Sequence, residues 1–266
     1  MNVPNNNNLY LKYPIYIISK GRYINPLTAK IFLKENINFK IAVEPQEYEN
    51  YCKAINPKFI LKLPFSNLGM GSTPARNYCW EHSTEGGCKK HFIFDDNIYG
   101  FSKLKDGNRT NCNAIDALLN LEKISDKFKN LAISGFNYTM FVTKATKKAF
   151  FINTHVYSGL LINNKIPFRW RLKYNEDIDL NLQALHNQWC TILLNAFLIK
   201  KVSTTAKMKG GNQDELYLNN RVDKKKLKAN SIREVWPQYV KVMNRFNRPH
   251  HQISWTKFFK HPLIKF

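Results

Sequence analysis

Short apolar runs and longer amphipathic stretches alternate along the N-terminal part of the chain. Apolar, β-branched runs typical of buried strands occur at residues 13–19, 39–44, 59–64 and 91–94. The segments between them carry apolar residues at helical spacing and predict helices over residues 25–36, 45–55 and 72–83. Because strand and helix alternate, the pattern indicates an α/β fold with a mostly parallel sheet flanked by helices on both faces.

The pattern is weaker in the rest of the chain. It predicts helices over residues 113–124 and 175–188, and strands over residues 131–135, 157–162 and 190–199. After residue 210 the sequence is basic and irregular. We therefore expect one α/β domain over residues 9–210 and a basic C-terminal extension over residues 211–266 that packs on the same domain.

Polar side chains follow several predicted strands at the point where each strand ends. Asp95, Asp96 and Asn97 come directly after a buried strand. Residues 19–22 follow the first strand, and Glu44 ends the second. Ligands of open α/β sheets bind beyond the carboxyl ends of the strands, so we expect these side chains to meet at one edge.

Asp95, Asp96 and Asn97 offer adjacent oxygen atoms of the kind that Mg²⁺ or Mn²⁺ prefers. Two neighbouring carboxylates repel each other and lose hydration together, so they need a partner at the end of an interior strand. A magnesium ion in such a place usually shares its coordination with substrate phosphates. The alternative is a loop in which Asp and Asn are simply favoured turn residues.

The segment "NLGMGSTPARN" at residues 67–77 combines glycines with the start of a predicted helix. Gly69 and Gly71 allow close approach of the backbone, and the free N–H groups of the helix start suit a phosphate. Arg76 offers a planar fork to the same group. The segment lacks the Lys-Ser/Thr ending of a Walker loop, and an ordinary capped helix remains the alternative.

A cluster of acids, Glu176, Asp177 and Asp179, lies at the start of the predicted helix 175–188. Acids at this position interact favourably with the helix dipole, which is sufficient reason for their presence. Asp177 is also a candidate general base near a reacting hydroxyl.

The chain is strongly basic. Its 41 Lys and Arg residues outnumber 19 Asp and Glu residues, which gives a net charge of +22. Such a field attracts polyanions, so a nucleic acid is the expected partner, with compositional drift as the alternative. The expected contacts are residues 169–173, residues 224–228, Arg245, Arg248, Trp255, Lys257, Phe258 and Lys260.

The remaining features concern the cellular compartment. No apolar run is long enough to predict a membrane span, and residues 1–8 are polar rather than signal-like. The 5 cysteines are widely spaced and form no C-x-x-C motif, which is typical of reduced thiols in a cytosol. We therefore expect a cytoplasmic protein with no membrane partner.

Together, these elements resemble a glycosyltransferase of the GT-A fold. The matching parts are a strand and turn, "IYIISKGR", a glycine-containing stretch at residues 71–77, a strand ending in "FIFDDN", and the later pair Glu176 and Asp177. They occur in the family's order over roughly residues 13–200. Within the superfamily, the chain is most similar to the TET/JBP-associated glycosyltransferases, relatives of the base J glucosyltransferase that glycosylate hydroxymethylated pyrimidines in DNA.

The resemblance implies a nucleotide-sugar donor, most simply UDP-linked, and a Mn²⁺ or Mg²⁺ ion. Asp95 and Asn97 would hold the metal, and Asp96 would contact the donor ribose or sugar. The motif ends in a neutral amide, which is a weaker ligand than the carboxylate often found there. A late histidine often completes such a site, and His250 and His251 are the candidates.

The resemblance also assigns the other residues of the site. Asp177, paired with Glu176, would be the catalytic base or would position the acceptor. The residues expected around the donor are Ser19, Gly21, Arg22, Glu44, Gly71, Arg76 and Asn77.

The implied reaction moves a sugar to the hydroxymethyl group of a 5-hydroxymethylpyrimidine in DNA, as in phage DNA hypermodification within an infected bacterial cell. Cytosine and uracil derivatives are both open as acceptors. A GT-A glycosyltransferase with a protein or glycan acceptor is the closest alternative. A nucleotidyltransferase and a non-catalytic DNA-binding protein are further ones, and no spaced acidic cluster favours a nuclease.

Overall fold

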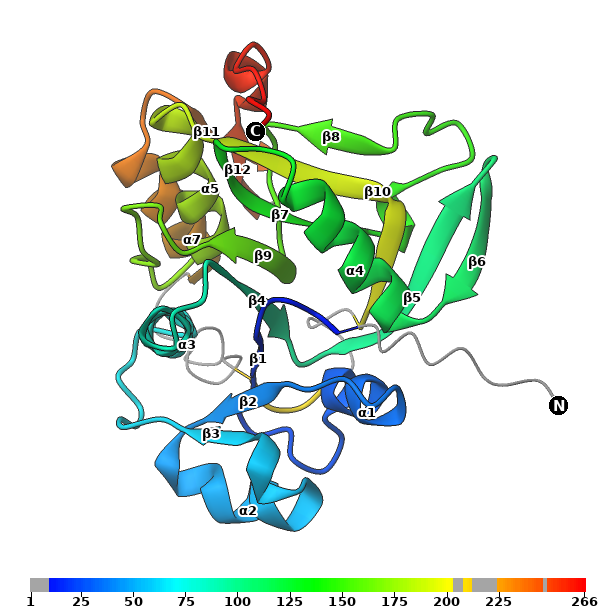
Figure 1. The fold of residues 1–266 in the computed structure, drawn as a ribbon. Coiled ribbons are helices and arrows are strands. Elements are labelled where there is room, and N and C mark those ends of the chain that lie inside the picture. Colours follow the sequence, from blue (N-terminus) through cyan, green and yellow to red (C-terminus); the bar gives the residue numbers. More distant parts are fainter. Residues whose placement is uncertain (1–9, 203–207, 212–223, 246–247) are drawn as a thin grey trace, which may run out of the picture.

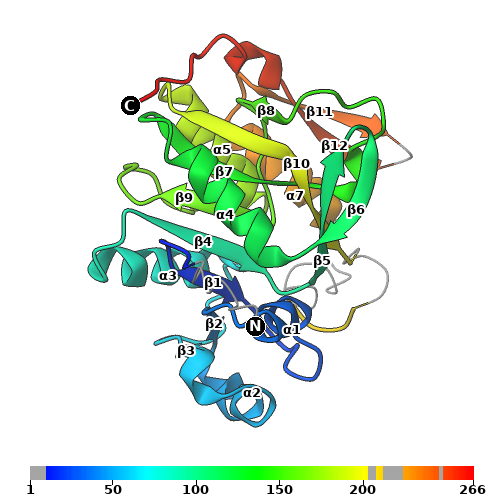
Figure 2. The ribbon, with the colours of Figure 1, turned by 45° about the vertical axis from the view of Figure 1, so that its right-hand side comes forward.

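The computed structural model describes residues 10–202, 208–211, 224–245 and 248–266. Figures 1 and 2 show a large twisted sheet with helices packed on both of its faces. The mostly parallel α/β fold predicted from the sequence is therefore confirmed. None of the helices in these ranges is long and apolar enough to cross a membrane.

The described residues form one ten-stranded sheet and a separate two-stranded hairpin. The strands of the sheet are β1 Ile15–Ile18, β2 Lys40–Val43, β3 Ile60–Lys62, β4 Lys90–Asp95, β5 Ile98–Lys105, β6 Asn108–Cys112, β7 Leu131–Tyr138, β8 Phe150–Ile152, β9 Gly159–Asn163 and β10 Cys190–Lys201. The hairpin consists of β11 Val240–Arg245 and β12 Arg248–Ile253.

The helices connect and cover these strands. They are α1 Leu27–Lys34, α2 Tyr48–Ala54, α3 Thr73–Glu85, α4 Ala114–Ser125, α5 Glu176–His186 and α7 Lys224–Val235. Short 3-10 turns lie at Pro45–Glu47, Pro57–Phe59, Thr139–Phe141 and Trp255–Phe258.

The strand order places the carboxyl ends of several strands at one edge. The order is β3-β2-β1-β4-β9-β7-β10-β5-β6, with β8 also pairing with β10. Strands β1 to β4 are mutually parallel, and β7 and β10 run in the same direction because β9 pairs antiparallel with both β4 and β7. The chain moves outward from β1 to β3 and returns at β4, so β1 and β4 flank a topological switch point, the usual place for a ligand.

Alternating side chains along the strands explain the two helical layers. Ile15 and Ile17 of β1 face a core that contains Phe32 of α1, together with buried residues of α2 and α4. Tyr16 faces the opposite core, which contains Trp80 of α3 and buried residues of α5. Because successive strand residues point to opposite faces, a fully apolar strand requires helices on both sides.

The segment after residue 210 contains regular structure that the sequence pattern did not predict. Where it is described, it forms α7 and the β11–β12 hairpin. Ile232 and Trp236 lie one helical turn apart and pack with Ile178 and Leu182 of α5 (Figure 1). The hairpin was hard to predict because β12 is mostly polar and shows no apolar period. The boundary at residue 210 stays a prediction.

A second hairpin was also absent from the sequence-based prediction. Strands β5 and β6 follow the Asp-Asp-Asn segment directly and are joined by Asp106 and Gly107, both with positive φ. An Asp-Gly pair between two strands is a strong hairpin signal, so this element was predictable.

Candidate active site

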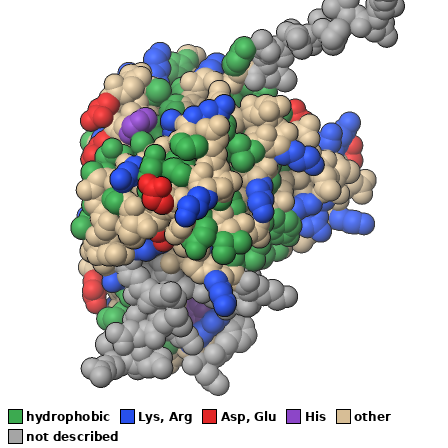
Figure 3. Space-filling model, turned by 90° about the horizontal axis from the view of Figure 1, so that it is seen from below, with side chains coloured by type: hydrophobic (Ala, Val, Ile, Leu, Met, Phe, Trp, Pro, Cys, Tyr) green, Lys and Arg blue, Asp and Glu red, His purple; other side chains and the backbone are tan. Residues whose placement is uncertain are grey.

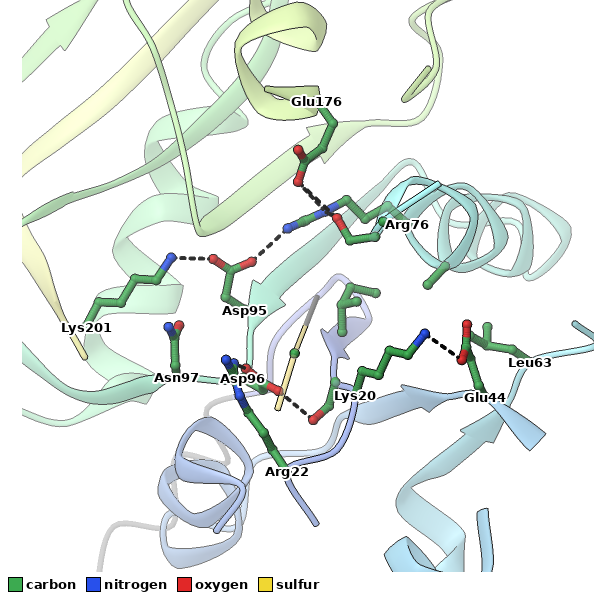
Figure 4. A pocket seen from close by; sticks show the side chains of 16 residues that line it. Lys20, Arg22, Glu44, Leu63, Arg76, Asp95, Asp96, Asn97, Glu176 and Lys201 are labelled. Atoms are coloured by element: carbon green, nitrogen blue, oxygen red, sulfur yellow. Dashed lines mark hydrogen bonds and ion pairs between the residues drawn. The ribbon is translucent and has the colours of Figure 1, made fainter. Parts of the chain in front are cut away.

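A cavity of about 210 Å³ lies at the carboxyl edge of the sheet. It opens at the switch point between β1 and β4, beside the start of α3 (Figure 4). Its walls are formed by Ile18, Ser19, Lys20, Arg22, Glu44, Leu63, Gly71, Ser72, Ala75, Arg76, Asp95, Asp96, Asn97, Glu176, Lys201 and Gly211. Segments that are far apart in the sequence therefore meet here, as the topology requires.

Asp95 lies between two cations. One carboxylate oxygen accepts a hydrogen bond from Nη2 of Arg76 at 2.7 Å, and the other from Nζ of Lys201 at 2.6 Å. Burial on its own would raise the pKa of Asp95, but Lys201 and Arg76 hold it well below its usual range. Asp95 is therefore a doubly paired carboxylate, and it fixes the position of both cations.

Asp96 is nearly fully buried and points to the other side of the strand end. It pairs with Nη1 of Arg22, and it accepts a hydrogen bond from Oγ of Ser19 at 2.7 Å. Ser19 also contacts the Tyr51 hydroxyl at 2.6 Å. Burial raises the pKa of Asp96, while Arg22 and Ser19 act in the opposite direction. The two neighbouring acids thus have separate cationic partners, and these positive charges offset the repulsion between Asp95 and Asp96.

Arg76 is buried at the first turn of α3. Its guanidinium lies 4.8 Å above the Trp170 ring, and its Nε donates to Oγ of Ser72 at 3.0 Å. Oγ of Ser72 in turn donates to Glu176 at 2.9 Å, so Ser72 makes no capping bond to the helix. Nη1 of Arg76 is buried without a hydrogen-bond partner, which marks it as a donor available to a ligand.

The rim of the cavity is formed by the turn after β1 and by residues that follow β10. Lys20 pairs with Glu44 at 3.0 Å. The carbonyl of Lys20 accepts from the Gly211 amide at 2.7 Å. A Cβ atom at Gly210 would lie 2.5 Å from the Gly21 carbonyl oxygen, so only glycine allows this close approach.

Two predicted donor-binding residues do not line the cavity. Asn77 uses its side-chain amide to hold the backbone of Trp170, donating to the carbonyl at 2.8 Å and accepting from the N–H at 3.1 Å. Gly21 donates its N–H to Glu47 at 2.8 Å. Both residues therefore shape neighbouring segments that do reach the cavity.

Glu176 and Asp177 are adjacent in sequence but face different surroundings. Glu176 faces the cavity, where burial and the neighbouring Asp177 charge raise its pKa. Asp177 pairs with Nε2 of His155 at 3.0 Å, and the His155 ring stacks on Trp255 with centroids 5.7 Å apart. Burial on its own would raise the pKa of Asp177, but His155 lowers it below its usual range.

Asp177 lies in a second hollow that borders the first. The two share four residues, which are Arg76, Asp95, Glu176 and Lys201. An ionised carboxylate that stands beside a cation-rich cavity can accept a proton from a nucleophile whose target is bound in that cavity.

The residues expected to hold a divalent cation are Asp95 and Asn97. Both carboxylate oxygens of Asp95 are bound by Arg76 and Lys201, whereas the side-chain oxygen of Asn97 is buried without a partner. Among the described residues, no group of three or more His, Cys, Asp and Glu side chains could hold a metal. One neutral oxygen beside two cations does not fit Mn²⁺ or Mg²⁺, so the metal site remains a prediction.

His250 and His251 do not complete a site at Asp95. Both lie on β12 and line another hollow together with His155 and Trp255. Burial lowers the pKa of His251, and Lys228 contributes in the same direction. The structure therefore does not place these two candidates in the cavity that holds Asp95.

The model of the family described as TET-Associated Glycosyltransferase matches residues 13–211, which include all of the cavity walls. The chain belongs to this glycosyltransferase family. The enzyme therefore uses a nucleotide-sugar donor and an acceptor, and the resemblance proposed from the sequence motifs is confirmed.

Other comparisons add little to the family match. The TET-associated glycosyltransferase is similar to a solved structure from Desulfovibrio desulfuricans G20, described as a putative nucleotide-diphospho-sugar transferase. The two are 9% identical, with a TM-score of 0.37, and the match covers 70% of this chain and 80% of that one. No curated protein matches the chain.

Some of the predicted DNA contacts of the glycosyltransferase are structural instead. Trp170 and Phe258 are buried, and Arg171 forms two hydrogen bonds of 2.9 Å to the fully buried Asp179. The run at residues 224–228 begins α7, but the side chains of residues 224 and 225 lie outside the described part. Figure 3 shows Lys and Arg scattered over the face seen from below, rather than gathered in one stripe.

Lys201 and Ser72 are site residues of the glycosyltransferase that the sequence pattern did not identify. Lys201 ends β10, which runs parallel to β4 through β7 and therefore ends at the same edge. The predicted strand 190–199 stops two residues before Lys201, and its direction in the sheet was unknown from the sequence alone. Ser72 stands at the start of the predicted helix 72–83 without a further signal of its own.

Proposed function

We propose that this glycosyltransferase moves a sugar from a UDP-linked donor to the hydroxymethyl group of a 5-hydroxymethylpyrimidine in DNA. The observation that carries the proposal is that the cation-rich cavity shares four lining residues with the hollow that holds Asp177. A donor and an acceptor bound in these two places would meet at Asp177. We assign the reaction to phage DNA hypermodification in the cytoplasm of an infected bacterium, following the relatives that the sequence resembles.

The donor cavity suits a nucleoside diphosphate. The unpartnered Nη1 of Arg76 and the amides at the start of α3 are donors for its phosphates. Ser19, Arg22 and Glu44 line the opposite part of the cavity and are suited to the ribose and base. Asp96 is held by Arg22 close to the same place, where its oxygen atoms can accept from a sugar hydroxyl.

The reaction is a substitution at the anomeric carbon. The hydroxymethyl oxygen attacks this carbon, and the bond from the carbon to the phosphate oxygen breaks. The bonding electron pair leaves with the nucleoside diphosphate, where the positive charge of Arg76 stabilises it. The hydroxyl proton passes to Asp177, whose pairing with His155 keeps it ionised and oriented before the reaction.

The acceptor side is suited to a nucleotide within a polyanion. His155 and Trp255 present stacked rings beside Asp177, and they line a further hollow together with Arg245 of the β11–β12 hairpin. Rings of this kind stack on bases, and arginines bind phosphates by charge. The net charge of +22 supports DNA over a neutral glycan as the acceptor.

The test is release of nucleoside diphosphate from a panel of sugar nucleotides. Plain DNA, hydroxymethylcytosine DNA and hydroxymethyluracil DNA would be compared as acceptors, with a chelator and with Mn²⁺. We expect release from a UDP-sugar that requires one of the modified DNAs, together with a mass increase of one sugar on that DNA.

The control for this test is Asp95→Ala, which should abolish release because Arg76 and Lys201 lose their common anchor. Release at the same rate with plain or no DNA would overturn the DNA acceptor and favour a protein or glycan. Release of pyrophosphate instead would indicate nucleotidyl transfer and overturn the proposed reaction.

A further inference from the structure

Lys201 occupies a position that a metal ion would need. It ends β10, and its Nζ lies 2.6 Å from Oδ2 of Asp95 and 2.7 Å from Oγ of Ser158. It also lies 5.8 Å from the centre of the Tyr138 ring. The ammonium is thus enclosed by oxygen atoms and one aromatic face, on the cavity side of the carboxylate expected to bind metal.

The surrounding charges oppose a further cation. A dication bound to Asp95 would stand next to the cations of Lys201 and Arg76, both of which touch that carboxylate. Like charges in direct contact with one carboxylate repel strongly where burial reduces the effective dielectric constant. Asp95 supplies one negative charge and Asn97 supplies none, so they offer little to offset this repulsion.

Both cations can still reach a ligand. The third contact of Lys201, to the Tyr138 hydroxyl, is long at 3.4 Å, so one of its N–H bonds can turn toward the cavity. Nη1 of Arg76 has no hydrogen-bond partner. Asp95 therefore holds two cations apart, and each cation keeps an N–H group that Asp95 does not occupy. A diphosphate has two separated groups of oxygen atoms, and two separated donors of this kind suit it.

We propose that Lys201, together with Arg76, takes the place of the divalent cation and makes donor binding independent of metal. The inference rests on the proposed nucleotide-sugar donor and deepens it. On this assignment, Lys201 touches the donor diphosphate and stabilises the negative charge that develops on it as the glycosidic bond to phosphate breaks. The unpartnered Asn97 oxygen then accepts a hydroxyl of the donor instead of binding metal.

The experiment measures nucleotide binding by the full chain, without acceptor. Isothermal titration calorimetry with UDP, GDP, CDP and ADP would be run in EDTA and again with Mn²⁺, and Mn²⁺ binding would be followed separately by electron paramagnetic resonance. We expect one diphosphate to bind with the same affinity, within about twofold, in both conditions. We also expect no Mn²⁺ signal that depends on Asp95.

Variants at the end of β10 provide the second readout. Lys201→Met should weaken binding of that diphosphate by about tenfold or more, the size of one charge-assisted hydrogen bond, and Lys201→Arg should restore most of it. Lys200→Met is the matched control, because Lys200 points away to Asn111. It should bind like the wild type.

The outcomes separate the two proposals. If the affinity for the diphosphate rises tenfold or more with Mn²⁺, or is unchanged in Lys201→Met, the proposed role of Lys201 is wrong. The proposed nucleotide-sugar donor would still stand. If the diphosphate binds without metal but sugar transfer does not depend on DNA, the proposed role of Lys201 stands and DNA is not the acceptor. Failure of every diphosphate to bind, with or without Mn²⁺, would overturn this inference and the proposed donor together.

Discussion

The two halves of the site hold their charges in different ways. In the donor cavity, Asp95 and Asp96 are each bound by cations and lie at the end of one buried strand. On the side proposed for the acceptor, Asp177 pairs with His155, whose ring stacks on Trp255 from a turn in the C-terminal segment. The first arrangement is rigid because strand ends and ion pairs fix it, while the second depends on the packing of a separate segment.

This difference predicts different roles for the same kind of residue. A carboxylate with two cationic partners stabilises a preorganised electrostatic site. A carboxylate with a single imidazole partner can approach a hydroxyl group and accept its proton. Substitutions in the donor cavity should therefore affect both stability and turnover, whereas substitution of Asp177 should affect mainly turnover.

The largest expected effect follows Asp95→Asn. The change leaves Arg76 and Lys201 facing a neutral amide, and unpairing buried charges of this kind costs about 3 kcal/mol. Turnover should fall about a hundredfold or more, because the cations lose their alignment. Urea unfolding and a sugar-transfer assay measure the two effects, with Asp106→Asn in the exposed turn between β5 and β6 as the control.

The same variant gives a pH dependence with a defined sign. The folded pKa of Asp95 lies below its ordinary value, so its stabilisation is fully present above the unfolded pKa of about 4. That stabilisation is lost as the pH falls below this value. The free energy of unfolding of the wild type should therefore drop more steeply between about pH 5 and pH 3 than that of Asp95→Asn. Parallel curves would contradict the paired state of Asp95.

Asp177→Asn should reduce turnover by a factor of about 10² to 10⁴, the usual contribution of a general base. Nucleotide binding should stay within about twofold of the wild type, because Asp177 lies outside the donor cavity. Asp116→Asn, in the first turn of α4, is the matched control for loss of a helix-start acid. Unchanged turnover in Asp177→Asn would show that another residue is the general base. The proposed difference in role between Asp95 and Asp177 would then be wrong.

Asp179→Asn tests how the C-terminal segment is held. The Asp179 carboxylate is fully buried, accepts from Arg171, and accepts from Nε1 of Trp236, the residue after α7, at 2.7 Å. We expect a loss of about 3 kcal/mol in stability and faster hydrogen exchange in α7. Glu234→Gln, on the exposed face of α7, should change neither. Slow exchange in the variant would show that the apolar contacts alone hold the segment.

The smallest effect is expected on the exposed hairpin. Arg245 and Arg248 face each other across β11 and β12, so replacing both by Ala should remove up to two phosphate contacts. The slope of log binding constant against log salt should then become shallower by about 1 per contact, without a change in base preference. Lys30→Ala with Lys123→Ala is the control pair, and an identical slope in both double variants would exclude the hairpin from the DNA interface.

The pattern of apolar and polar residues predicts much of the sheet and one edge of the site, although it did not predict β5, β6 and β8. Apolar strands alternating with amphipathic helices allow little besides a parallel sheet with two helical layers. In such a sheet the residues after β1, β2 and β4 must meet, which is why the order of strands and helices alone places Ser19, Glu44 and Asp95 together. The turn between β5 and β6 is also encoded locally, by its Asp-Gly pair.

Which distant side chains contact the residues at that edge follows from the tertiary structure alone. Lys201 reaches Asp95 because β10 runs parallel to β4 through an intervening pair of strands, and strand direction leaves no mark on the local pattern. Asn77 turns to the Trp170 backbone, and Trp255 stacks on His155, through contacts over long sequence separations. Residue type and period are local properties, whereas the partner of a charge depends on how distant segments pack.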